Sequence, residues 1–160
     1  MLFSRKDKNQ KETERPIEQP LIYQGNGFTI KQPEGWQDKT IHTLLGPIKS
    51  DVQHNIIITV EENVTCNSVS DYADIQITAL EQQLMGCHLL KREEITLSNG
   101  KPAYKVIFRW DPSDQFPIYQ EQVFVLNDGK AYKITTSFSR KTRKTMGPEI
   151  DRIIMSFQNM

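Results

Sequence analysis

The chain has 160 residues, of which 37% are apolar and 9% aromatic, and its 20 Lys and Arg side chains balance 20 Asp and Glu. This length fits a single domain with a hydrophobic core, and the composition excludes a collagen, a coiled coil and a wholly disordered chain. No stretch approaches the roughly 20 apolar residues of a membrane span, and a neutral charge balance argues against a dedicated DNA-binding protein. We therefore expect no nucleic-acid partner and no direct membrane insertion.

The first twenty residues differ from the rest of the chain. They carry five basic and four acidic side chains but only three large apolar ones, Leu2, Phe3 and Ile17, too few to offset the entropy of ordering. We predict a flexible charged N-terminal tail at residues 1–20 and one domain at residues 21–160. A secretory signal needs an apolar run of about 7–15 residues after the first charges. No such run is present, so the expected location is the cytoplasm.

Three β-rich runs follow and predict strands. They are Phe28–Gln32, Lys39–Leu45 and Asn55–Glu61, and Gly46-Pro47 is expected to end the second.

The next run predicts a helix. Ser68 lies three residues before Asp71, a pattern that begins helices, and Gly86 is well placed to end the helix. One helical stripe of apolar residues connects them: Val69, Tyr72, Ala73, Ile77, Leu80 and Leu84.

Two turn dipeptides predict β-hairpins in the second half. Asn99-Gly100 and Asp128-Gly129 tolerate the positive φ angles of tight turns. The four strands they separate are Leu89–Ser98, Lys101–Asp111, Phe116–Asn127 and Lys130–Phe138.

A last helix is predicted from the spacing of Ile150, Ile153, Ile154 and Phe157, with Pro148 in its first turn. The basic run Arg140–Lys144 precedes it and reads as a solvated loop, with a phosphate-contacting patch as the alternative. The predicted fold class is α+β: an antiparallel sheet of about six to seven strands flanked by two main helices.

No catalytic or metal-binding pattern stands out. The nucleophile elbow and the glycine-rich phosphate loops are missing from the sequence, and no histidine is spaced from another or from a cysteine as in a zinc site. Cys87 and His88 would point to opposite faces of a strand. We expect a non-enzymatic protein with no catalytic residue, no metal and no cofactor.

Alternation along the strands exposes a row that is apolar and uncharged. Ile41, Thr43 and Leu45 share one face of the second strand, Ile57 and Thr59 share one face of the third, and Ile118 aligns with Gln120 and Gln122. If the helices occupy one face of the sheet, the other should be polar where it meets water. The row is therefore either an interaction surface or covered by a second helix layer, and the pattern leaves both open.

Several short motifs, in order, resemble the DcrB-like family and, within it, the Eag-type chaperones of type VI secretion effectors. The resemblance runs from about Phe28 to Phe157. Its markers are Pro33-x-Gly35-Trp36-x-Asp38, Leu84-x-Gly86, Leu89-Leu90-Lys91-Arg92, Asn99-Gly100-Lys101-Pro102-Ala103, Phe108-x-Trp110, Gln120-x-Gln122-Val123-Phe124 and Ala131-Tyr132-x-Ile134-Thr135-Thr136.

This resemblance implies a PsbP-like α/β/α sandwich and a homodimer whose curved sheets form an apolar cradle. Such chaperones hold the transmembrane segments of a secreted effector, its N-terminal apolar helices, in the cytoplasm before export. The family's cradle positions fall on Ile41, Thr43, Ile57, Leu84 and Ile118. With Thr59, Gln120 and Gln122 from the same rows, they form the predicted partner-binding surface. The alternative is a general protein-interaction module of a secretion or envelope system that binds no membrane segment.

Overall fold

The computed structural model describes residues 21–49, 52–112 and 116–160. The predicted tail at residues 1–20 lies outside this range. The chain separates into two compact units after Asp38. In the first, β1 (Ile22–Gln24) and β2 (Thr29–Lys31) form a two-stranded antiparallel hairpin, of which the sequence predicted only the second strand. The second unit, residues 39–160, contains the main sheet and both helices.

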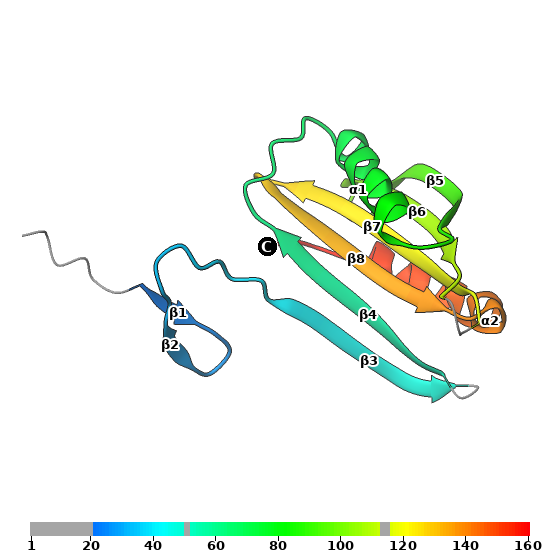
Figure 1. Cartoon of the computed structure of the whole chain (residues 1–160), viewed down its shortest axis with the longest axis horizontal. Coiled ribbons are helices and arrows are strands. Elements are labelled where there is room, and N and C mark those ends of the chain that lie inside the picture. Colours follow the sequence, from blue (N-terminus) through cyan, green and yellow to red (C-terminus); the bar gives the residue numbers. More distant parts are fainter. Residues whose placement is uncertain (1–20, 50–51, 113–115) are drawn as a thin grey trace, which may run out of the picture. The chain divides into compact units, whose positions relative to one another are not determined.

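The main sheet has six antiparallel strands in the order β3-β4-β8-β7-β6-β5 (Figure 1). This confirms the predicted α+β class. The strand bounds are β3 (Ile41–Lys49), β4 (Val52–Glu61), β5 (His88–Thr96), β6 (Pro102–Trp110), β7 (Ile118–Asn127) and β8 (Lys130–Phe138).

The two predicted hairpin turns are confirmed. Gly100 has a φ of 83°, and Asp128 and Gly129 have φ angles of 48° and 72°. These are left-handed conformations that Asn, Asp and Gly tolerate. The turns fix the registers of β5 with β6 and of β7 with β8.

Strand β3 continues past Gly46-Pro47, where the sequence predicted its end. A bulge between Leu45 and Ile48 absorbs the two residues before pairing resumes with Gln53. Because β3 is an edge strand of the sheet, a proline with no N–H to donate is tolerated there.

Helix α1 (Val69–Gln83) begins as predicted. The Ser68 side chain accepts a hydrogen bond from the Asp71 backbone N–H at 3.0 Å. Leu84 forms its C-cap, and Gly86 follows with a φ of 65°.

Helix α2 (Arg140–Met155) begins earlier than predicted. The basic run Arg140–Lys144 is helical, not a loop, and Pro148 lies inside the helix, not in its first turn. A capping box between Ser139 and Thr142 starts the helix. The buried stripe of α2 extends back accordingly, through Thr142, Met146, Ile150 and Ile154.

The two helices pack on opposite faces of the sheet, which confirms the predicted sheet flanked by two helices; the condition that both share one face is not met. Helix α1 lies over β6 and β7 and buries Tyr72, Ala73 and Ile77 against Phe108 and Phe124. Helix α2 packs on β7 and β8 from the other side (Figure 1). Its core cluster contains Val123, Val125, Ile134, Met146, Ile150 and Ile154. The result is a three-layer α/β/α arrangement.

Candidate functional site

Helix α1 covers only part of its side of the sheet. In the view of Figure 1 it lies in front of the β6–β7 side, while β3, β4 and much of β8 have no helix in front of them. We call this uncovered area, on the α1 side of β3, β4, β8 and the first half of β7, the open sheet face. Its side chains are Ile41, Thr43, Leu45, Asn55, Ile57, Thr59, Lys133, Thr135, Ser137, Ile118, Gln120 and Gln122.

The strand registers bring most of the predicted site residues together on this face. Ile41 lies opposite Thr59, and Thr43 lies opposite Ile57. Directly paired residues of antiparallel strands point to the same face. The row from Thr43 and Ile57 continues through Thr135 of β8 to Gln122 of β7. The open sheet face therefore alternates aliphatic side chains with hydroxyl and amide groups.

Exposure of the open sheet face falls from the sheet edge toward α1. Ile41 and Leu45 on edge strand β3 are 61% and 66% exposed. Ile57 and Thr59 on β4 are half-buried, and Gln122 on β7 is only 5% exposed. The open sheet face is therefore most accessible along edge strand β3 and least accessible next to α1.

The glutamines form a short polar ladder at the inner side of the open sheet face. Gln122 donates to the Gln120 side-chain oxygen at 3.4 Å, and Gln120 donates to the Ser137 hydroxyl at 3.0 Å. The Gln122 side-chain oxygen and the indole N–H of Trp110 are buried without hydrogen-bond partners among the described residues. Trp110 on β6 pairs with Ile118 on β7, so its side chain lies on the same side of the sheet as Gln122. This side therefore contains both an unpaired donor, the Trp110 N–H, and an unpaired acceptor, the Gln122 oxygen.

Leu84 is the one predicted residue that comes from outside the sheet. It is half-buried at the C-cap of α1 and packs against the α1-side core cluster. It belongs to the helix that bounds the open sheet face. Ile118 is half-buried at the start of β7.

Sequence reasoning missed the contribution of β8. Lys133, Thr135 and Ser137 lie on the open sheet face, whereas their neighbours Ile134, Thr136 and Phe138 are buried on the α2 side. The alternation of partly exposed polar and buried residues along β8 was the available signal. Lys133 places one positive charge on this face, and the Glu61 carboxylate lies on the same side of β4, next to α1.

A hydrogen-bonded pair stands at the far end of β4. The Tyr72 hydroxyl donates to the Glu61 carboxylate at 2.7 Å. Burial, and then this hydrogen bond, raise the pKa of Tyr72 above its ordinary value. The phenol therefore stays protonated, and the pair holds the start of α1 against β4.

The two cysteines and the common metal ligands can be placed within the described part of the chain. Cys66 and Cys87 are free thiols. Burial, with a smaller contribution from Glu81, raises the pKa of Cys87, which disfavours its reactive thiolate form. Among the described residues, no group of three or more His, Cys, Asp or Glu side chains is arranged to hold a metal ion.

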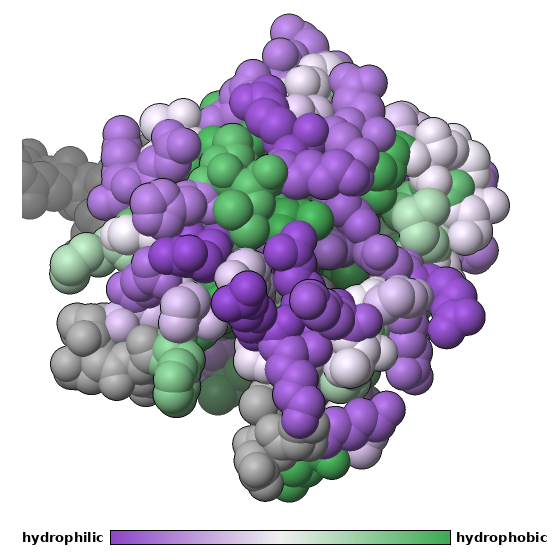
Figure 2. All heavy atoms as spheres, turned by 90° about the vertical axis from the view of Figure 1, so that its right-hand side faces the viewer, coloured by the Kyte–Doolittle hydropathy of each residue, from purple (hydrophilic) through white to green (hydrophobic). Residues whose placement is uncertain are grey.

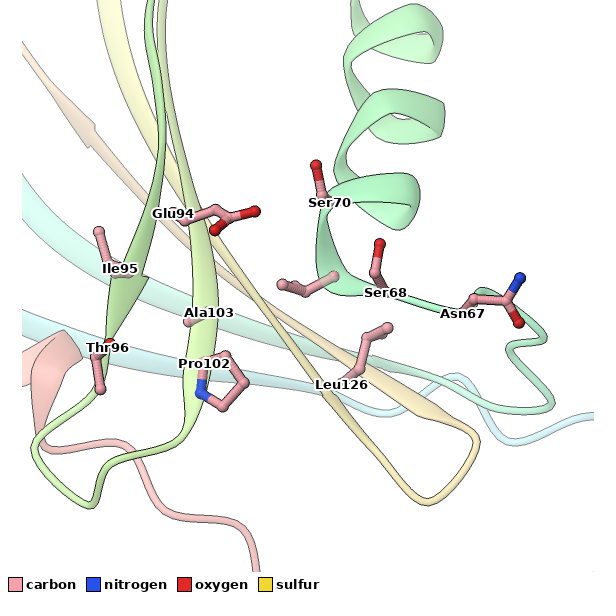
Figure 3. Close-up of a pocket in the computed structure, with 10 residues that line it drawn as sticks. Asn67, Ser68, Ser70, Glu94, Ile95, Thr96, Pro102, Ala103 and Leu126 are labelled. Carbon is pink, nitrogen blue, oxygen red and sulfur yellow. The ribbon is translucent and has the colours of Figure 1, made fainter.

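A cleft of about 530 Å³ lies between the start of α1 and the β5–β6 hairpin. Glu94 extends from β5 toward the helix, with Ser68, Ser70 and Leu126 around the cleft (Figure 3). The Ser68 hydroxyl already caps α1. The remaining side chains form no recognisable catalytic arrangement.

Exposed apolar side chains occur on several elements, including Ile75 of α1 and Leu90 of β5. The face seen in Figure 2 is mostly hydrophilic, and its hydrophobic side chains are gathered into patches. Within the described part of the chain, no helix is long and apolar enough to cross a membrane.

One match to a protein-family profile establishes the family of this chain. The DcrB family profile matches residues 28–156, which is most of the chain. The chain belongs to the DcrB family.

Two solved structures extend this assignment to the fold of the DcrB domain. PA94 from Pseudomonas aeruginosa, described as a protein of unknown function, is 19% identical with a TM-score of 0.71, and the match covers 88% of this chain and 97% of that one. The solution structure of the cyanobacterial PsbP protein (CyanoP) from Synechocystis sp. PCC 6803 is 15% identical with a TM-score of 0.54, covering 88% and 92% of the two chains. These likenesses support the PsbP-like fold. No curated protein matches this sequence.

Proposed function

We propose that this DcrB-family protein is a non-enzymatic chaperone or adaptor that shields apolar helical segments of a partner protein on the open sheet face. The observation that carries the proposal is the pair Ile41 and Leu45, more than half exposed at the edge of a face that α1 leaves uncovered. An apolar surface with few charges, next to polar groups, is typical of a protein-binding site.

The free energy available to such a site is substantial. Apolar surface removed from water contributes roughly 25 cal/mol per Å². Shielding about 1,000 Å² of a helix would gain about 25 kcal/mol gross, most of which is offset by association and ordering costs. Ile41, Leu45 and Ile57 supply the aliphatic contacts for this burial.

The polar groups of the open sheet face suit a helix that is apolar but contains small polar residues. Thr43, Thr59 and Thr135 present hydroxyls between the aliphatic side chains. The Gln122 oxygen is an acceptor that has no partner among the described residues. This oxygen is buried, so the threonine hydroxyls are the polar groups that face a bound segment.

The resemblance of the sequence motifs to Eag-type chaperones supports one choice of partner. We propose as the partner a type VI secretion effector whose N-terminal apolar helices are held in the cytoplasm before export. We further propose that the chaperone acts as a homodimer, with two open sheet faces available to one effector. This function requires no nucleotide, metal or other cofactor.

A second candidate function is a general protein-interaction module that pairs backbones instead of holding a helix. Edge strand β3 favours this possibility, since it exposes Leu44 and Ile48 as well as Ile41 and Leu45. Such a strand can accept an extended segment of a partner by strand addition.

The test is co-expression with a neighbouring effector that carries N-terminal apolar helices. Ile41→Asp and Ile57→Asp place a charge on the open sheet face and should sharply reduce the soluble effector. Ile75→Asp is the matched control, because Ile75 on α1 is 57% exposed but lies outside this face. Unchanged effector solubility in both open-face variants would contradict the proposal, as would an equal loss in the control.

A further inference from the structure

The first half of α2 presents a concentrated basic surface that the proposed chaperone function does not use. Four of the first five residues of this helix are basic: Arg140, Lys141, Arg143 and Lys144. Arg140, Lys141 and Lys144 are exposed, and Arg143 is half-buried. The intervening Thr142 is buried and attaches the helix to the sheet. We call the four basic side chains the α2 basic surface.

The protein itself does not neutralise the α2 basic surface. Among the described residues, no acidic side chain forms an ion pair with any of the four, and the first turn of α2 contains no acidic residue. The Arg143 guanidinium lies 5.2 Å from the centre of the Tyr119 ring, a contact that orients the cation without cancelling its charge. Five basic side chains of the sheet are instead paired with carboxylates at 2.6 to 3.1 Å: Lys91, Arg92, Lys105, Arg109 and Lys130. The α2 basic surface is therefore a local excess of positive charge on a chain with no net charge.

The α2 basic surface is unfavourable for the fold on its own. Arg140 and Lys144 are four residues apart on the helix, and Lys141 and Lys144 are three apart. Like charges at these spacings are neighbours on the helix surface and destabilise it. The N-terminal end of a helix also carries partial positive charge, which disfavours basic side chains there. An anionic partner would remove both effects, and residue choices that oppose folding are expected at functional surfaces.

The composition of the α2 basic surface indicates the kind of anionic partner. Within residues 140–145 the side chains that are not basic are two threonines, so no aromatic or aliphatic side chain belongs to this surface. A specific protein interface is built around such side chains, and a nucleic-acid-binding domain is normally basic as a whole. Anionic lipid headgroups need neither feature, because clusters of about four or more Lys and Arg side chains on a helix attract them electrostatically. We propose that the α2 basic surface docks this protein peripherally on an anionic lipid membrane.

Docking through α2 determines which side of the protein faces the lipid. Helix α2 packs on the face of the sheet opposite α1 and the open sheet face (Figure 1). The charged residues of α1 are all acidic, namely Asp71, Asp74 and Glu81, so an anionic membrane does not attract that helix. The open sheet face is therefore directed away from the membrane and stays accessible to a partner protein.

Vesicle sedimentation of the full chain tests the proposal. The two probes are vesicles of phosphatidylcholine alone and vesicles of phosphatidylcholine mixed equally with phosphatidylglycerol. Each basic side chain near an anionic membrane strengthens binding about fivefold, so we expect at least about tenfold more binding to the mixed vesicles at about 0.01 M salt. At about 1 M salt, where the Debye length is about 3 Å, this preference should disappear. Equal binding to the two kinds of vesicle, or a preference that survives high salt, would overturn the proposal.

Charge-reversal variants test the position of the contact. Arg140→Glu combined with Lys141→Glu should weaken binding to the mixed vesicles at least about tenfold. Acidic side chains suit the first turn of a helix, so this variant should melt no lower than the native protein. Lys31→Glu combined with Lys39→Glu changes the net charge equally outside α2 and should retain most of the binding. Unchanged binding of the first variant, or an equal loss in the control, would refute the assignment.

Two further measurements address the orientation and the class of partner. Lipids with spin-labelled headgroups should broaden the NMR signals of residues 140–145 and leave that of Ile75 on α1 unchanged. Broadening centred on α1 or on the open sheet face would contradict the proposed docking. Tighter binding to duplex DNA or to polyglutamate than to the mixed vesicles, at equal concentrations of negative charge and the same salt, would also overturn it, in favour of a nucleic acid or an acidic protein. None of these experiments contains an effector, so their failure is distinguishable from failure of the chaperone proposal.

Discussion

A buried charge cluster beneath α2 makes folding stability depend on pH in a direction that can be tested. Lys105 Nζ lies 3.1 Å from Glu121 and 2.6 Å from Asp151. The Glu121 side chain is only 12% exposed. Burial raises the pKa of Glu121 to about 7, with a smaller contribution from Asp151, and Lys105 offsets only part of this effect.

The sign follows from the difference between the folded and unfolded states. The pKa of Glu121 rises from an ordinary 4.5 to about 7 on folding, so the folded state favours the protonated acid. Its contribution to stability is therefore complete below about pH 4.5 and is lost as the pH rises through 7. At about 1.4 kcal/mol per pH unit, the cost of ionised Glu121 at pH 8 is at most about 3.5 kcal/mol.

Glu121→Gln mimics the protonated acid and should remove this cost. We expect the variant to be about 1–3 kcal/mol more stable than the native protein at pH 8, an increase of several degrees in Tm, and nearly equal to it at pH 4.5. Thermal unfolding followed by circular dichroism at both pH values measures the difference. A variant that melts at or below the native temperature at pH 8 would refute the reasoning.

Asp151→Asn is the matched control and should act in the opposite direction. Burial pushes the pKa of Asp151 upward, but hydrogen bonds with Lys105 and Glu121 outweigh burial and lower it. Because this pKa is lowered on folding, ionised Asp151 stabilises the folded state at pH values above the ordinary pKa of 3.8. This contribution to stability is lost on acidification. Asp151→Asn should therefore lower Tm at pH 8.

Two further predictions concern the helices and the core. Ser139→Ala removes one half of the capping box of α2 and should cost about 1 kcal/mol of unfolding free energy in a denaturant titration; an unchanged midpoint would show that Thr142 caps the helix alone. Phe124 is fully buried and packs edge-on against Tyr72, with ring centroids 5.6 Å apart. Phe124→Ala should therefore lower the free energy of unfolding by about 3–5 kcal/mol. A loss below about 1 kcal/mol would contradict the packing described for α1.

Local chemistry explains which elements the sequence predicts well. The turns at Asn99-Gly100 and Asp128-Gly129 and the cap at Ser68 depend on neighbouring residues only, so their residue types are sufficient evidence. Strand β1 was missed because three mostly exposed residues carry no buried face to recognise. The start of α2 was missed because Arg140–Lys144 is almost entirely polar, and its one buried residue is Thr142.

Contacts between distant segments limit how much of the open sheet face can be predicted from the sequence. Strict alternation in β3 and β4 was enough to place Ile41, Thr43, Ile57 and Thr59 on one face. Tertiary packing decides which face of the sheet each helix covers, and local sequence does not specify it. In the structure, the row of open-face residues lies on the same side of the sheet as α1. A pocket of about 200 Å³ between α2 and the edge strands could not be predicted, since it depends on where α2 packs relative to β3.

The central claim is that the open sheet face holds an apolar helix, and site-specific photocrosslinking in cells of the native host tests it most directly. A benzophenone amino acid replacing Thr43 reports on this face, and one replacing Ile75 reports on the exposed side of α1. We expect position 43, and not position 75, to crosslink to a peptide from an apolar stretch long enough to span a membrane, identified by mass spectrometry. Crosslinks from position 43 only to polar or extended segments, or the same peptides from both positions, would contradict the account.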